Sequence, residues 1–190
     1  VPSLMSVYEG WDGYQLALVR TVTPLLQEQL AWRAAPHLRS TGELIAHIVT
    51  GRIGWIHTNM GVESPEVTEW TAEWRDTSKQ SRFVGGALKE GTEHNTKALV
   101  SGLEATWKMI EGILTGWTTD DLRRTFLHPY WGKTYVVPYQ WVLWRIMCHD
   151  IHHGGELSIM LGLQGIAVPD LGDQGGHLTE VPEADQPPVE

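Results

Sequence analysis

At 190 residues, the chain has room for one domain with a substantial core and is short for two. A formal net charge of −9 argues against a nucleic-acid partner, because binding phosphates needs clustered lysines and arginines. The single cysteine, Cys148, allows no intrachain disulfide and predicts a reducing, cytoplasmic location. No apolar run approaches about 18 residues, so we expect no membrane-spanning helix.

Apolar residues recur at helical spacing in the first part of the chain. They predict an amphipathic helix from Leu4 to about Leu30, with a kink at Pro24. Residues 32–36, which end in a proline, should break this helix.

A second helix has a clear start signal. Ser40 and Glu43 fit the capping box, in which each side chain bonds the backbone N–H of the other residue. The helix should run from Thr41 to about Met60, with His47 on or beside its inward face. By itself, His47 is more often a hydrogen-bonded core histidine than a metal ligand.

The middle of the chain predicts a connection, a helix and an extended segment. Residues 61–81 read as a long connection, and Thr92 to Leu114 as a third amphipathic helix. Phe126 to Val137 can form a hairpin or an extended crossover. Pro138 then suits the first turn of a fourth helix, which reaches Leu163.

The fourth helix carries the strongest chemical signal. His149 and His153 are four residues apart and therefore lie on one helix face, with Cβ atoms about 5–6 Å apart. Two imidazoles at this spacing form half of a site for a divalent metal. The alternative is a histidine-rich helix end whose rings bond to backbone or water. Glu156 follows on the same face.

The C-terminal segment differs in composition from the rest. Residues 169–190 are acidic and rich in proline, without lysine or arginine. We therefore divide the chain into a body, 1–168, and a C-terminal tail, 169–190.

Two motifs together resemble the DinB-like metalloprotein superfamily: Gly42-Glu43-Leu44-Ile45-Ala46-His47-Ile48 and His149-Asp150-Ile151-His152-His153-Gly154-Gly155-Glu156. The resemblance extends roughly from Met5 to Pro169. It implies an all-α fold, a four-helix bundle in up-down-down-up order with a long crossover between the second and third helices. It also implies that three histidines bind a divalent metal. By motif position these are His47, His149 and His153.

The resemblance leaves other roles open. Many members have Arg-Gly-Gln where this chain has Gly154-Gly155-Glu156, so a role of that arginine or glutamine does not transfer. We consider Glu156 and Glu43 as candidate general bases or as hydrogen-bond partners of an imidazole. The alternatives are a helix cap for Glu43 and a solvated helix face for Glu156.

Three neutral imidazoles leave coordination positions open on the ion, as a catalytic site requires. Zinc and nickel suit such ligands best, and iron or manganese less well. The ion would ionise a bound thiol or water. We therefore expect a metal-dependent enzyme acting on a small molecule, first a thiol-dependent S-transferase using a low-molecular-weight thiol and second a metal-assisted hydrolase.

Two other hypotheses remain. The metal could be structural, in a non-catalytic binding or stress-response module, and a fourth protein ligand would favour that reading. Alternatively, the histidines are core residues that bind no metal. We also expect a homodimer, because the acidic tail and the many tryptophans need a surface to cover them.

Overall fold

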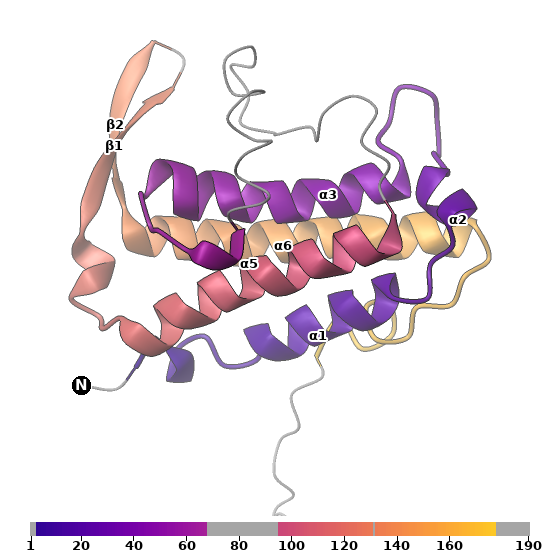
Figure 1. The fold of residues 1–190 in the computed structure, drawn as a ribbon, viewed down its shortest axis with the longest axis horizontal. Helices are drawn as coiled ribbons and strands as arrows, with labels where there is room; N and C mark the ends of the chain where they lie inside the picture. Colours follow the sequence, from indigo (N-terminus) through magenta and orange to yellow (C-terminus); the bar gives the residue numbers. More distant parts are fainter. Residues whose placement is uncertain (1–2, 68–94, 131, 178–190) are drawn as a thin grey trace, which may run out of the picture.

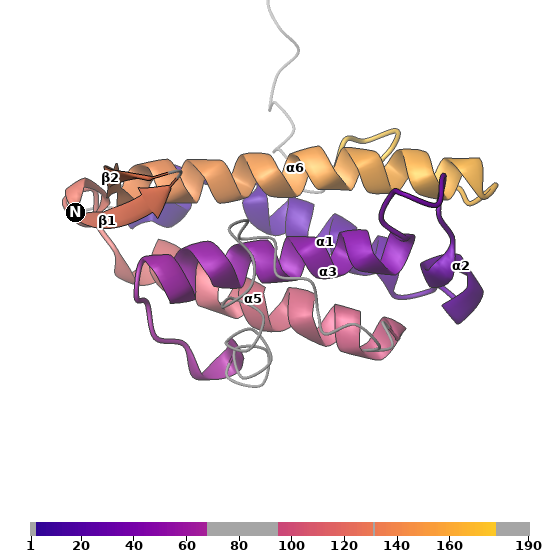
Figure 2. The ribbon, with the colours of Figure 1, turned by 90° about the horizontal axis from the view of Figure 1, so that it is seen from above.

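Four long helices form the body of the computed structural model, which describes residues 3–67, 95–130 and 132–177. Helices α1 (Trp11–Val22), α3 (Thr41–Arg52), α5 (Thr96–Gly116) and α6 (Tyr139–Leu163) lie side by side around one core (Figures 1 and 2). The smaller elements are the helix α2 (Gln27–Ala31), the π-helix η2 (Ile53–Asn59), the 3₁₀ turns Leu4–Ser6, Pro65–Val67 and Asp121–Arg123, and the strands β1 (Thr125–Tyr130) and β2 (Lys133–Pro138). No helix in the described ranges is both long and apolar enough to cross a bilayer.

The expected first helix, Leu4 to Leu30, is wrong as a single element. The helix α1 covers only its centre, because the chain before it turns at Gly10, whose φ of 94° is left-handed. At the other end, α1 stops at Val22, just before Pro24, which has no N–H to continue the helical bonds. The short helix α2 follows as a separate element.

The capping box at the start of α3 is confirmed. Ser40 Oγ accepts a hydrogen bond from the Glu43 N–H at 3.2 Å, and Glu43 Oε2 accepts from the Ser40 N–H at 2.9 Å. After Arg52 the helix widens into the π-helix η2, a rare geometry that often marks functional sites. The expected connection continues into residues 68–81, which lie outside the described residues, as does most of the expected long crossover.

The all-α expectation needs one correction, a small β hairpin. Strands β1 and β2 pair antiparallel from Thr125 opposite Pro138 to Tyr130 opposite Lys133, and Gly132 turns between them with a φ of 73°. Alternating β-branched residues in β2 favour this pairing over a helix. The hairpin projects from one end of the helices (Figure 1) and leads directly into α6 at Tyr139.

A buried polar network joins the four long helices. Arg52 from α3 and Asp150 from α6 are both fully buried and form an ion pair, with Nη2 and Oδ2 2.9 Å apart. Trp11 of α1 donates to the same carboxylate oxygen at 3.2 Å. Arg52 Nη1 donates to Gln15 of α1 at 2.8 Å and to Thr106 of α5 at 3.1 Å. Every donor of this network therefore fixes one helix against another.

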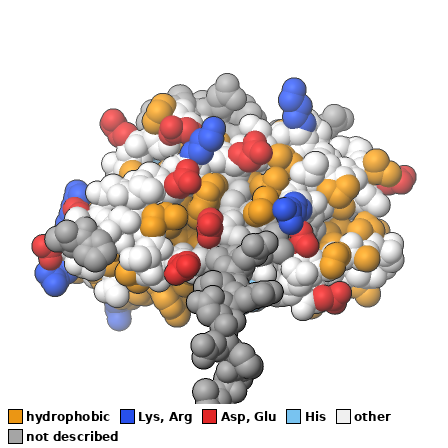
Figure 3. Space-filling model, turned by 90° about the horizontal axis from the view of Figure 1, so that it is seen from below, with side chains coloured by type: hydrophobic (Ala, Val, Ile, Leu, Met, Phe, Trp, Pro, Cys, Tyr) orange, Lys and Arg blue, Asp and Glu red, His pale blue; other side chains and the backbone are white. Residues whose placement is uncertain are grey.

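The first part of the tail packs on α1. Leu171 is buried in the core, and Asp170 lies 4.0 Å from the Arg20 guanidinium. Gly176 lies so close to the ring of Tyr14 that a Cβ there would be 2.2 Å from Cδ2. Residues 178–190 lie outside the described part. On the α1 side of the molecule, acidic, basic and hydrophobic side chains are interspersed (Figure 3).

Candidate functional site

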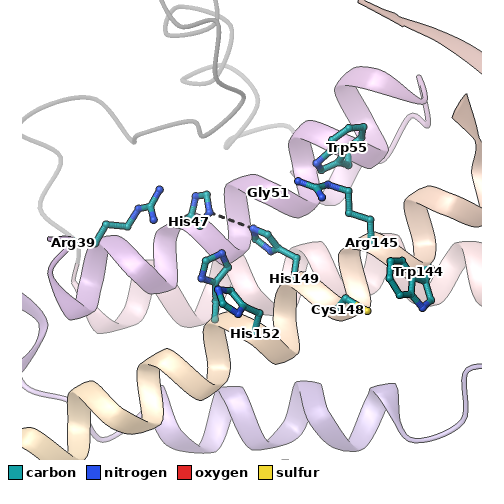
Figure 4. Close-up of a pocket in the computed structure, with 10 residues that line it drawn as sticks. Arg39, His47, Gly51, Trp55, Trp144, Arg145, Cys148, His149 and His152 are labelled. Atoms are coloured by element: carbon teal, nitrogen blue, oxygen red, sulfur yellow. Dashed lines mark hydrogen bonds between the residues drawn. The ribbon is translucent and has the colours of Figure 1, made fainter. Parts of the chain in front are cut away.

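The three predicted histidines meet between α3 and α6. The Nε2 atoms of His47 and His149 are 3.2 Å apart, and the ring centroid of His153 lies 4.7 Å from that of His47 and 4.4 Å from that of His149. One nitrogen from each ring lies within 4.8 Å of the other two. Figure 4 shows His47 facing His149 across the space between the helices. Residues 102 positions apart thus converge on one point.

Two glycines allow close contacts near the site: Gly51 of α3 with the ring of His149, and Gly154 of α6 with the hydroxyl of Tyr14. A Cβ on Gly51 would lie 2.7 Å from His149 Cε1, so the ring of His149 occupies the space that a side chain on α3 would take. A Cβ on Gly154 would lie 1.9 Å from the hydroxyl of Tyr14, which donates to the Asp150 carbonyl at 3.2 Å. A larger residue at either position would force the ring of His149 or of Tyr14 to shift.

Burial favours the neutral form of two histidines of the cluster, His47 and His153. It lowers the pKa of His47 to about 3, and the positive charge of Arg39 lowers that pKa further. Burial also lowers the pKa of His153, although the neighbouring Glu156 carboxylate opposes the shift. Neutral imidazole is the form that binds metals, so these two rings are in their ligating state near neutral pH.

Glu156 fixes the orientation of His153. Its Oε2 accepts from His153 Nδ1 at 2.7 Å, while its Oε1 lies 3.2 Å from Nε2 of the exposed His152. With the proton on Nδ1, the Nε2 lone pair of His153 is free for a ligand. Glu43, by contrast, is held in the helix cap by Ser40 and by Arg33, whose Nη1 donates to it at 2.6 Å. Glu43 is not among the residues that line the cleft beside the three histidines.

His149 lies beside the buried carboxylate. Its Nδ1 is 3.9 Å from Asp150 Oδ1, and both atoms are buried without a hydrogen-bond partner. The negative charge favours the tautomer that carries the proton on Nδ1, which again leaves Nε2 available.

Arg52 and Asp150 were not among the residues predicted for the site. A signal existed, because Arg52 follows Ile48 by four residues and Asp150 follows Ile146 by four, so both lie on the buried stripes of their helices. Opposite charges at core positions of two amphipathic helices predict a buried pair. Gly51 follows His47 by four residues and so shares its helix face, but nothing in the sequence connects it to His149.

The geometry of the cluster fits a divalent metal ion. Nitrogens bound at about 2.0–2.1 Å to a tetrahedral ion lie about 3.3 Å apart, close to the 3.2 Å between Nε2 of His47 and Nε2 of His149. The donor set, three imidazoles, is the one that zinc and other borderline metals prefer.

A cleft of about 640 Å³ opens beside the histidines. His47 and Arg39 lie at one end, and Arg145 and Trp55 at the other (Figure 4). The lining residues are Arg39, His47, Gly51, Trp55, Trp144, Arg145, Cys148, His149, His152 and His153. The described lining contains no Asp or Glu, and it has room for a small molecule.

Comparison with known proteins agrees with this fold. The model of the DinB superfamily matches residues 15–157. Among solved structures, a DinB-like protein from Bacillus cereus ATCC 10987 is similar, with a TM-score of 0.59 and 20% identity over 85% of this chain and 93% of that chain. At this identity the likeness shows the fold alone. No curated protein matches the chain.

Proposed function

This chain belongs to the DinB superfamily, and on that premise we propose that it is a metal-dependent enzyme whose divalent ion is held by His47, His149 and His153. The observation that carries the proposal is the convergence of the three rings, each of which places one nitrogen within 4.8 Å of the other two. Zinc and nickel suit the three imidazoles best.

The cleft supports a catalytic over a structural role. Among the described residues, the cluster offers three histidine ligands from α3 and α6; of the two neighbouring carboxylates, Glu156 is bonded to Nδ1 of His153 and Asp150 is paired with Arg52. The 640 Å³ cleft adjoins the same histidines, so a small molecule can reach them. An ion that only tied α3 to α6 would need no such access.

The lining favours a thiol over water as the nucleophile. A divalent ion at the histidines would supply a Lewis acid that lowers the pKa of either group. Water is far less acidic than a thiol and therefore depends more on a protein base to lose its proton. Because the described lining has no carboxylate, we rank thiol-dependent transfer to an electrophile first and hydrolysis second. Trp55 and Trp144 provide apolar walls for that electrophile.

Glu156 acts as a positioning residue in this proposal. It holds the proton of His153 on Nδ1 and thereby directs Nε2 toward the cluster. Glu43 serves as the cap of α3 and acts at a distance, by fixing the start of the helix that carries His47.

Elemental analysis of protein purified without an affinity tag tests the metal site. We expect about one equivalent of zinc or nickel in the wild type and far less in His47→Ala. His177→Ala, an exposed histidine outside the cluster, is the matched control and should keep the metal. Equal metal in the wild type and His47→Ala, or none in either, would contradict the proposal.

The thiol role has a separate spectroscopic test. Cobalt-loaded protein titrated with 2-mercaptoethanol should develop a thiolate-to-metal charge-transfer band, because an open position lets the thiol bind the ion. The alcohol analogue ethylene glycol is the control and should give no such band. A spectrum that 2-mercaptoethanol leaves unchanged would argue for a closed, structural site.

A further inference from the structure

The cleft is cationic although the chain is acidic. The formal net charge of the protein is −9, yet the charged residues of the described cleft lining are two arginines, Arg39 and Arg145, with no carboxylate. The face over α1, in contrast, mixes acidic and basic side chains (Figure 3). A cleft lined by one sign of charge concentrates ligands of the opposite sign. The ligand of this cleft should therefore carry a negative charge.

Arg145 is the best-positioned cation of the cleft. Its guanidinium lies 5.1 Å from the Trp55 ring centroid and 5.4 Å from that of Trp141. The two indole centroids are 5.3 Å apart and the ring planes are inclined by 66°, and the guanidinium lies within cation–π distance of both rings. No carboxylate in the described ranges forms an ion pair with Arg145, and its side chain is exposed to solvent.

Resting on the function proposed above, we propose that Arg145 binds the carboxylate of a small organic substrate whose other end reaches the histidine cluster. The indole rings contact the guanidinium of Arg145 through cation–π interactions. These interactions leave N–H groups of the guanidinium free to donate hydrogen bonds to a carboxylate. Trp55 belongs to the rare π-helix η2, and Trp144 lines the same cleft, so the body of the substrate would lie against indole rings.

The single guanidinium favours a carboxylate over a phosphate. One positive charge compensates one carboxylate, and the planar fork of arginine matches the two carboxylate oxygens. A phosphate monoester carries almost two charges near neutral pH and would need a second cation beside Arg145. The other arginine of the lining, Arg39, lies beside His47 at the far end of the cleft (Figure 4).

Binding of 3-phenylpropanoate, measured by ligand-observed NMR, tests this assignment. The neutral amide 3-phenylpropanamide has the same shape without the charge, so it is the control ligand. We expect the acid to bind about tenfold more tightly than the amide, as a charge-assisted hydrogen bond provides. Arg145→Ala should lose this preference, and Arg145→Lys should keep part of it.

The matched control variant is Arg124→Ala. The Arg124 guanidinium is also held by two rings, 4.9 Å from Tyr139 and 5.9 Å from Trp117, but it does not line the cleft. Its removal should leave the preference for the acid intact. If Arg145→Ala binds the acid as tightly as the wild type, or if the wild type does not distinguish acid from amide, the assignment is overturned.

Measurement on zinc-loaded and on EDTA-treated protein separates this inference from the metal proposal. The Arg145 contact does not involve the histidines, so the preference for the acid over the amide should persist in both forms. Loss of metal binding together with a retained Arg145-dependent preference would contradict only the metal site. Retained metal without that preference would contradict only the carboxylate subsite.

Discussion

Arg52 and Asp150 form a fully buried ion pair, with Nη2 and Oδ2 2.9 Å apart, directly behind the histidine cluster. Each partner is the chain neighbour of a cleft residue, since Arg52 follows Gly51 and Asp150 follows His149. Burial by itself would raise the pKa of Asp150, but the Arg52 guanidinium outweighs it and holds that pKa below its ordinary value. Both groups are therefore charged, and the pair anchors α3 against α6 where the histidines meet.

Asp150→Ala should destabilise the protein strongly. It leaves the Arg52 charge buried without its partner, which typically costs about 3–5 kcal/mol. Urea unfolding followed by circular dichroism would measure the loss. The matched control is Asp120→Ala, which breaks the exposed pair of Asp120 with Arg123 and should change stability little. Similar effects of the two substitutions would show that the buried pair does not anchor the helices.

Gly51→Ala should weaken metal binding. The new Cβ would lie 2.7 Å from His149 Cε1, so the ring must move away from His47. We expect at least about a tenfold loss of zinc affinity, as for other changes that misorient a ligand. Competition with a fluorescent zinc chelator measures this affinity.

Gly112→Ala is the control for the glycine substitution. Gly112 lies within α5, and a Cβ there meets no atom within 4 Å. It should leave zinc affinity unchanged and stabilise the helix by up to about 1 kcal/mol. If Gly51→Ala also keeps wild-type affinity, the close approach of α3 to His149 does not matter for the site.

Glu156→Ala should lower zinc affinity by about 10- to 100-fold, because His153 loses the acceptor that keeps its proton on Nδ1. The control, His152→Ala, removes the other partner of the same carboxylate without touching the three-histidine cluster. Its affinity should stay close to that of the wild type. The opposite order, with His152→Ala the weaker binder, would assign the metal to the second group of potential ligands, formed by His152, His153 and Glu156.

Acid should destabilise the metal-free protein partly through His47. Its pKa is about 3 in the folded protein and about 6.5 in an unfolded chain. Between these values the unfolded chain binds a proton that the folded protein does not. The free energy of unfolding must therefore fall as the pH decreases from about 6.5 toward 3.

Urea unfolding of EDTA-treated protein between pH 4.5 and 7.5 checks this slope. His47→Gln should show a shallower pH dependence, equivalent to about one proton fewer taken up on unfolding. The exposed His177→Gln should follow the wild type. Parallel curves for all three proteins would mean that His47 titrates normally in the folded state.

Features that depend on local spacing were predictable from the sequence. The Ser40 and Glu43 capping box, the hairpin alternative for residues 126–137 and the fourth helix, which starts at Tyr139, all follow from neighbouring residues. The pairing of His149 with His153 also needs only helical periodicity. Homodimer formation, a cytoplasmic location and the boundary between body and tail stay predictions.

The residue types of a possible site could be read from the sequence, because helix periodicity fixes the face on which each histidine lies. The contact of His47 with His149 comes from the packing of α3 against α6, where the ring of His149 lies against Gly51 and the buried Arg52–Asp150 pair joins the two helices. The same packing placed Arg145 between Trp55 of η2 and Trp141 of α6. Such contacts join residues far apart in the chain, and no local pattern encodes the distance between two helices.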